Sequence, residues 1–414
     1  MIVNARARRI AYPRELQDIL NIARAREDRA WLVGWSELSP LATPLYALPD
    51  LAAELGLAAV SIKDESRRSP LGSFKALGAP IALLRLILRL HPTAPFDPSG
   101  LLAGRHAEQL RNFTVVSATD GNHGRGLAAA SRSIGCRCVI VLHAQVSPER
   151  ERAIAECGAQ IVRVAGNYDA SVEEARRLAV AKGWQVVSDT SYEGYEAVPR
   201  DVMQGYAVIA AEVIEATASI RGEPGPFTHV FVQGGVGGLA AGVGSYFWEH
   251  HQENRPRFML VEPQQADCLY QSARAGHVTG ASGSVDSVMA GLACGIPSPL
   301  AWRFLQPLID CFLTVSDQEA IHAMRRLAGG SVQDVPVVSG ESGAAGLAGL
   351  LALSRDSAAR RAAGLNHGSR VLLINTEGAT APGLYADLVG ESAQSVCSRQ
   401  AAWLLQRSTP CGLG

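Results

Sequence analysis

The sequence lacks an uninterrupted apolar stretch of the roughly 20 residues that a membrane-spanning helix requires. The longest candidate, around Ala79–Leu90, is interrupted by Arg85 and Arg89. The basic N-terminal segment has no apolar block of the kind found in secretory signals, and Glu15 and Asp18 argue against a mitochondrial presequence. We therefore expect a cytoplasmic protein with no membrane partner.

The chain also has almost no net charge, with a formal value of -1 over 414 residues. This balance gives no global attraction to nucleic acid or to an anionic membrane surface, so no nucleic-acid partner is expected. Low-complexity runs are absent. With 47% hydrophobic residues, the sequence is rich enough in apolar side chains for a large buried core, and its length corresponds to about two to three domains.

The eight cysteines include no C-x-x-C pair, so the signature of a zinc site is missing and no metal is predicted. Reduced, mostly buried thiols are the expected state. Cys268 and Cys294 flank one loop-rich segment, and a disulfide between them stays open.

Short β-like runs alternate with helical ones from Phe113 to Asp189, which predicts α/β architecture with a largely parallel sheet. A long helix is expected next, from about Val198 to Thr217, and it is followed by further strands. The tail after about Ala393 is weakly patterned.

One of these later strands runs into a glycine-rich turn, FVQGGVGGLAAGVGSYF (Phe231–Phe247). Glycines allow backbone N–H groups to approach an anion, and the helix that follows adds a partial positive charge, so a phosphate is the expected guest. An ordinary βα turn is the alternative. The spacing matches neither an NTPase P-loop nor a dinucleotide fingerprint, although Glu249 and Glu253 leave a dehydrogenase incompletely excluded.

Lysine is scarce, and Lys75 stands at the start of an apolar helical stretch with no further lysine until Lys182. An apolar pocket disfavours the charged amine and lowers its pKa. An amine of this kind together with a phosphate site is what pyridoxal 5'-phosphate (PLP) requires, with Phe74 near its ring. An ordinary surface lysine is the alternative reading of this residue.

Seven motifs, in the same order along the chain, match one group of enzymes. They are IKDES (Ile62–Ser66), LGSFKALG (Leu71–Gly78), SATDGNHGRGLAAAS (Ser117–Ser131), SDTSYEGYE (Ser188–Glu196), MAGLACGIPS (Met289–Ser298), SGESGAAGLAGL (Ser339–Leu350) and INTEGAT (Ile374–Thr380). Together they resemble the fold-type II PLP enzymes, the group of tryptophan synthase β and threonine dehydratase. Within the third motif, the stretch Asp-Gly-Asn-His-Gly-Arg-Gly is similar to that of the diaminopropionate ammonia-lyase family. The residues just before Lys75 depart from the family pattern.

The resemblance implies a two-domain fold with the cofactor in the cleft between a large domain, 1–75 and 195–414, and a small one, 76–194. It implies that Lys75 carries PLP as an imine and becomes the base at the substrate Cα. The implied cofactor contacts are Phe74, Asn122 at the ring hydroxyl, Gly234, Gly235, Val236, Gly237 and Gly238 at the phosphate, and Thr376 at the pyridine nitrogen.

Two acids are implied catalytic residues. Asp120 is expected to serve as a second base opposite Lys75, or to hold the substrate's β-ammonium group, with a turn or cap role as the alternative. Asp189 is the second candidate for the β-amine. His123 is expected to be a structural neighbour, and Glu341 to support the pyridine edge, to bind backbone amides or to hold a cation.

The implied activity is PLP-dependent α,β-elimination of D- or L-2,3-diaminopropionate to pyruvate and ammonia, by a cytoplasmic homodimer of amino-acid metabolism. A serine or threonine dehydratase, or a β-replacement synthase acting through aminoacrylate, is the alternative on the same fold. A protein that only senses an amino acid is the alternative outside catalysis, and it needs neither Lys75 nor Asp120.

Overall fold

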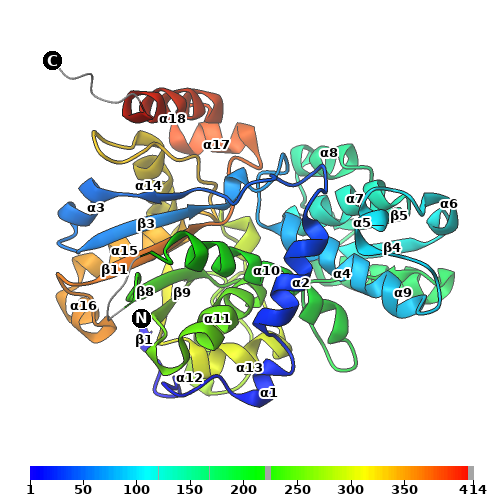
Figure 1. Cartoon of the computed structure of the whole chain (residues 1–414), viewed down its shortest axis with the longest axis horizontal. Coiled ribbons are helices and arrows are strands. Elements are labelled where there is room, and N and C mark those ends of the chain that lie inside the picture. Colours follow the sequence, from blue (N-terminus) through cyan, green and yellow to red (C-terminus); the bar gives the residue numbers. More distant parts are fainter. Residues whose placement is uncertain (120, 167, 220–224, 409–414) are drawn as a thin grey trace.

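A computed structural model describes residues 1–119, 121–166, 168–219 and 225–408 of the chain. In this part of the chain the strands form two separate sheets (Figure 1). The larger has the order β1 (Ile2–Val3), β10 (Cys311–Val315), β9 (Arg257–Pro263), β8 (His229–Gln233), β11 (Arg370–Asn375), β3 (Ala59–Asp64) and β2 (Leu45–Ala47). The smaller has the order β6 (Gln160–Val164), β5 (Arg137–His143), β4 (Thr114–Ala118) and β7 (Gln185–Val186).

Both sheets are mostly parallel, because among the described strands only the edge strands β1 and β2 pair antiparallel to their neighbours. The central strand β8 is buried along its whole length, as expected of a parallel strand covered by helices on both faces. The predicted α/β class is confirmed. The division into domains 1–75 with 195–414 and 76–194 stays a prediction; the four strands of the smaller sheet all fall within 76–194.

The helices around the larger sheet are α1 (Arg14–Gln17), α2 (Ile22–Leu32), α3 (Pro49–Glu54), α10 (Ala197–Ala216), α11 (Gly238–His251), α12 (Cys268–Ala275), α13 (Pro299–Leu308), α14 (Asp317–Gly329), α15 (Ala345–Arg355), α16 (Ser357–Ala363), α17 (Pro382–Val389) and α18 (Ala393–Ser408). Those near the smaller sheet are α4 (Lys75–Leu90), α5 (Pro98–Leu102), α6 (Ala107–Leu110), α7 (Asn122–Ile134), α8 (Pro148–Glu156) and α9 (Tyr168–Lys182). Short 3₁₀ turns are η1 (Glu65–Arg67), η2 (Gln252–Asn254) and η3 (Ala290–Leu292). None of the described helices is long and apolar enough to cross a bilayer.

The weakly patterned tail after Ala393 forms a 16-residue helix, α18 (Figure 1). Its apolar pattern is weak because little of it is buried. Val396 enters the core, and the Gln400 amide donates to the Pro336 carbonyl oxygen at 2.8 Å. A single buried apolar side chain leaves no stripe for a sequence pattern to show.

A buried charge network joins β3 to α10 on the large-sheet side of Lys75. The Lys63 ammonium lies 2.6 Å from Glu212, and the Arg68 guanidinium lies 2.7 Å from Glu212 and 2.8 Å from Glu65. All four side chains are almost fully buried. Because each charge in this network has an opposite charge beside it, the network fixes α10 against the segment that leads into Lys75.

Candidate active site

Lys75 is the first residue of α4, and it is held where the large sheet ends. The Phe74 N–H donates to the Thr376 carbonyl oxygen at 3.1 Å, and Ser73 forms an isolated bridge with Glu377. The turn before them uses Gly72 at φ +68°, a conformation that glycine adopts without strain. These contacts place the lysine beside the residues that directly follow β11.

The Lys75 ammonium donates to Asp189 Oδ2 at 2.5 Å. The same nitrogen lies 5.3 Å from the ring centroid of Phe74 and 5.6 Å from that of Tyr206. Tyr206 was not singled out from the sequence; the available signal was an aromatic residue between small apolar ones in the long α10 helix. The structure thus brings Lys75, Phe74 and Asp189 together, and their catalytic and binding roles stay predictions.

The expectation of a lowered pKa for Lys75 is wrong for the geometry in which its amine meets Asp189. Burial is the largest single influence and lowers the Lys75 pKa, but Asp189, Tyr206 and Cys294 together raise it more, so the pKa lies well above the ordinary lysine value. Burial raises the pKa of Asp189 and the Lys75 charge lowers it, with a net shift downward. Both groups are therefore charged at neutral pH.

His123 lies behind Asp189, with its Nδ1 atom 4.0 Å from Asp189 Oδ2 and its Nε2 atom 3.0 Å from the Val187 carbonyl oxygen. Burial lowers the pKa of His123, so the ring is neutral at pH 7. This arrangement agrees with the expected structural role, since the ring is tied to the backbone that carries Asp189.

The glycine turn after β8 has the shape of an anion cradle. Gly235 and Gly237 have φ values of +65° and +97°, and α11 begins directly after them. Among the described residues, no group accepts a hydrogen bond from the N–H of Gly235 or Val236. A Cβ atom on Gly237 would lie 2.7 Å from Leu305 Cδ1, so the turn has no room for a side chain there. Unpaired N–H groups at a helix N-terminus suit a phosphate.

The turn and the lysine belong to one site. A Cβ atom added to Gly238 would lie 3.9 Å from the Asp189 carbonyl oxygen and 3.9 Å from Tyr206 Cε2. Tyr206 therefore lies between the glycine turn and the Lys75 ammonium. Residues from three distant parts of the sequence converge where strands of the larger sheet end, the usual ligand position in parallel α/β folds.

Asn122 is the first residue of α7, and its side-chain amide donates to Glu377 Oε2. The other Glu377 oxygen accepts from the Ser342 N–H at 3.2 Å. Burial raises the pKa of Glu377. Burial and the neighbouring Glu377 carboxylate together raise the pKa of Glu341 to about 7. Glu377 was missed as a functional residue, although it stands beside Thr376 in the quoted INTEGAT motif. Thr376 itself is buried.

Glu341 contacts α8, which lies beside the smaller sheet. Its Oε1 atom lies 3.4 Å from the Arg150 guanidinium of α8, and its Oε2 atom is buried with no hydrogen-bond partner in the described structure. The described residues contain no group of three or more metal-ligating side chains. The predicted residue Asp120 lies outside the described residues.

Cys268 is a free thiol whose Sγ atom lies 3.6 Å from the Gly235 carbonyl oxygen and 3.7 Å from Glu262 Oε1, the two acceptors within reach of its single S–H. The disulfide that the sequence left open between Cys268 and Cys294 is therefore not formed in this structure. Cys294 still lies close to the same turn, because its sulfur would be 3.7 Å from a Cβ atom on Gly235.

Comparisons with known proteins agree with this site. Residues 37–377 match the family described as "Pyridoxal-phosphate dependent enzyme". Diaminopropionate ammonia-lyase of Salmonella typhimurium is 39% identical over 361 residues, which is 85% of this chain and 89% of that protein. The crystal structure of the holo Escherichia coli diaminopropionate ammonia-lyase superposes with a TM-score of 0.83 at 34% identity, covering 94% of this chain and 95% of that one. A structure of the same enzyme with an aminoacrylate-PLP azomethine intermediate gives 0.82 at 33% identity, covering 95% and 97%.

An amine at a helix start, a cradle of unpaired N–H groups and an asparagine amide are the groups that PLP needs, so the residues present fit this cofactor. The chain belongs to the pyridoxal-phosphate dependent enzymes and has their fold-type II architecture. Within this class it belongs to the diaminopropionate ammonia-lyase family.

Proposed function

We propose that this protein converts 2,3-diaminopropionate and water into pyruvate and two molecules of ammonia. The observation that carries the proposal is the contact between the Lys75 amine and Asp189 beside the glycine turn, in a chain 39% identical to a diaminopropionate ammonia-lyase. When bound, PLP draws electron density from the Cα of an amino acid and makes its Cα proton acidic.

Each part of the cofactor has its own proposed binding residues. Gly234, Gly235, Val236, Gly237 and Gly238 are proposed to hold the phosphate, Phe74 and Asn122 the ring, and Thr376 the pyridine nitrogen. A neutral hydroxyl at that nitrogen leaves the ring less protonated than a carboxylate would, which suits elimination.

Lys75 is proposed as the base that takes the Cα proton. Its contact with Asp189 keeps the amine near that carboxylate, so a proton on the nitrogen is stabilised once it has been taken up. The departing β-amine is a poor leaving group unless it is protonated. Asp189 is our candidate for binding the β-ammonium group, since a carboxylate complements that cation.

Asp120 is proposed as the second base, acting on the enantiomer that presents its Cα proton away from Lys75. The Asp120→Asn variant is then expected to lose activity on one enantiomer of diaminopropionate far more than on the other. Equal losses on both would count against a separate base.

The activity is tested by incubating the PLP-loaded protein with D- and L-diaminopropionate, serine and threonine, and measuring keto acid and ammonia. Pyruvate and ammonia in a ratio of one to two, from diaminopropionate in preference to the hydroxy amino acids, support the proposal. Keto acid mainly from serine or threonine supports a dehydratase. Turnover only after a thiol or amine is added supports a β-replacement synthase.

The homodimer and the cytoplasmic location stay predictions as well. Light scattering of the purified protein tests the dimer, and fractionation of cells that express the full chain tests the location.

A further inference from the structure

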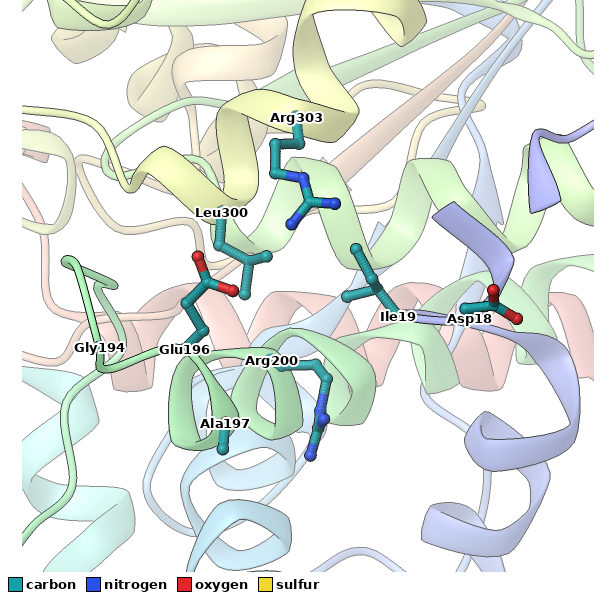
Figure 2. A pocket seen from close by; sticks show the side chains of 8 residues that line it. All are labelled: Asp18, Ile19, Gly194, Glu196, Ala197, Arg200, Leu300 and Arg303. Atoms are coloured by element: carbon teal, nitrogen blue, oxygen red, sulfur yellow. The ribbon is translucent and has the colours of Figure 1, made fainter. Parts of the chain in front are cut away.

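A pocket of about 490 Å³ lies between α10, α13 and the segment that joins α1 to α2 (Figure 2). Its lining includes none of the residues assigned above to the cofactor or to catalysis. The charged side chains Asp18, Glu196 and Arg303 and the apolar side chains Ile19 and Leu300 contribute to its walls.

The charges that line this pocket are not paired with one another. Arg200 also lines it, but its guanidinium donates to Asp201 at 3.1 Å. The side chains of Asp18, Glu196 and Arg303 have no hydrogen bond or ion pair within the described residues. In Figure 2 the Arg303 guanidinium extends from α13 toward α10, and the Glu196 carboxylate extends from α10 toward Leu300. One cation and two anions thus line the same space without neutralising each other.

This pattern matches the chemistry of a free α-amino acid. A guanidinium binds a carboxylate through two parallel hydrogen bonds, and a carboxylate accepts from an ammonium group. Ile19 offers apolar surface to the carbon chain between them. We propose that the pocket is a second site for an α-amino acid, with the carboxylate at Arg303 and the ammonium groups at Glu196 and Asp18. The proposal rests on the proposed function for the choice of diaminopropionate as ligand.

Hydrogen bonds join the wall of the pocket to the loop that carries Asp189, the residue that contacts Lys75. Ser298, which caps α13, shares a hydrogen bond of 2.7 Å with Ser191, and Ser191 Oγ accepts from the Leu300 N–H at 2.9 Å. Ser191 is two residues beyond Asp189 in the same loop, and Glu196 stands at the far end of that loop. A ligand that draws Glu196 and Arg303 together therefore acts on the loop that carries Asp189.

The same helix also contacts the glycine turn. The Ser298 N–H donates to the Val236 carbonyl oxygen at 3.0 Å, and Ala301 Cβ would lie 3.1 Å from a Cβ atom on Gly237. The outer face of α13 thus lines the pocket while its inner face supports the phosphate cradle. These contacts give a route by which binding at one face can affect the other, and any such effect is reciprocal.

The test separates this pocket from the cofactor site. L-2,3-diaminopropionate is titrated by calorimetry into the Lys75→Ala protein without PLP, and into the same protein carrying Arg303→Ala, Glu196→Gln or Asp189→Asn. We expect Arg303→Ala and Glu196→Gln each to weaken binding at least about tenfold, which corresponds to 1.4 kcal/mol. Asp189→Asn is expected to leave that binding event in place.

Two matched variants control the result. Arg274→Ala removes an exposed arginine from α12, outside the pocket, and is expected to change nothing. Ala197→Trp fills the pocket from α10 without removing a charge, and is expected to abolish the binding event. Thermal unfolding of each variant shows whether it is folded.

Binding that is unchanged in Arg303→Ala and in Ala197→Trp would overturn the proposal, as would the absence of any binding at millimolar concentration. The failure of the proposed function looks different. In that case the wild-type protein with PLP makes no pyruvate from diaminopropionate, whereas the calorimetric result with the Lys75→Ala protein is unaffected.

Discussion

Lys75 Nζ and Asp189 Oδ2 lie 2.5 Å apart although 114 residues separate them in the sequence. Lys75 begins α4, and Asp189 follows β7 of the smaller sheet. The contact thus joins the start of one helix to the end of a strand, and it makes the charge of the lysine depend on the carboxylate. This dependence gives the site a pH response that can be measured.

Replacing Asp189 by Asn is expected to move PLP loading to lower pH. Only the neutral amine forms the bond to the cofactor aldehyde, and Asp189 raises the pKa of Lys75 and so keeps it protonated. Without the carboxylate, the main influence that raises the Lys75 pKa is lost, and burial, which lowers it, is opposed only by Tyr206 and Cys294. The midpoint of the loading rate is therefore expected to shift down by about one to three pH units.

The measurement is the rate of visible-absorbance change after PLP is added to apo-protein across a series of pH values. Asp356→Asn, at the exposed N-cap of α16, is the control, and its midpoint should equal that of the wild type. An unchanged or higher midpoint in Asp189→Asn would show that Asp189 does not govern the charge of Lys75.

The glycine turn predicts a difference between two glycine-to-alanine variants. Gly237→Ala places a Cβ atom at φ +97° and 2.7 Å from Leu305, so we expect a loss of about 1–3 kcal/mol in unfolding free energy and at least about tenfold weaker PLP binding. Gly329→Ala, at the end of α14, meets nothing within 4 Å and should be near neutral. Denaturant unfolding and equilibrium dialysis of PLP check both, and equal effects would contradict the prediction.

Much of this site was predictable from the sequence. The turn at Gly234–Gly238 and the lysine at a helix start depend on local chemistry, which short motifs retain. Their convergence was inferred from a family resemblance, because no local pattern states which strand ends meet. The pKa of Lys75 was misjudged for the same reason: apolar neighbours in sequence predicted the effect of burial, but the carboxylate that contributes most to the raised pKa lies far away in the chain.

Glu377 and α18 were missed for different physical reasons. Glu377 is buried and touches Asn122 from across the site, so its importance depends on a contact between distant segments. α18 has Val396 as its only fully buried apolar residue in the described part of the helix, so no 3.6-residue period is visible. Both cases show that sequence patterns report local burial better than tertiary partners.

Asn122 and Glu377 are expected to act as one unit in a double-mutant cycle. Asn122→Ala leaves Glu377 without one donor, and Glu377→Ala leaves the Asn122 amide and the Ser342 N–H without their acceptor. Because both variants lose the same bond, the double variant should be more stable than the sum of the single losses predicts, by about 0.5–3 kcal/mol.

Denaturant unfolding of the four proteins measures this coupling energy. Glu377→Gln keeps one acceptor oxygen and should lose less stability than Glu377→Ala. Strictly additive losses would show that the Asn122–Glu377 bond does not hold Asn122 in place.

The last prediction concerns the charge network that anchors α10. Burial raises the pKa of Glu212, but Arg68 and Lys63 outweigh burial and hold the pKa below its ordinary value. Glu212→Gln leaves those two cations without their shared carboxylate, so we expect a loss of about 3–5 kcal/mol at neutral pH. Glu215→Gln on the same helix removes a half-exposed ion pair with Arg29 and should cost less than about 1 kcal/mol.

The pH dependence has a definite sign. A carboxyl group with a depressed folded-state pKa contributes its full stability above the unfolded-state pKa, and this contribution is lost as the pH falls through the folded-state value. The wild type should therefore lose stability on acidification below the ordinary glutamate pKa more steeply than Glu212→Gln, and the two curves should converge. Thermal unfolding over a descending pH series gives both curves. Parallel curves would mean that Glu212 carries no charge in the folded protein, and the proposed anchoring of α10 by that charge would be wrong.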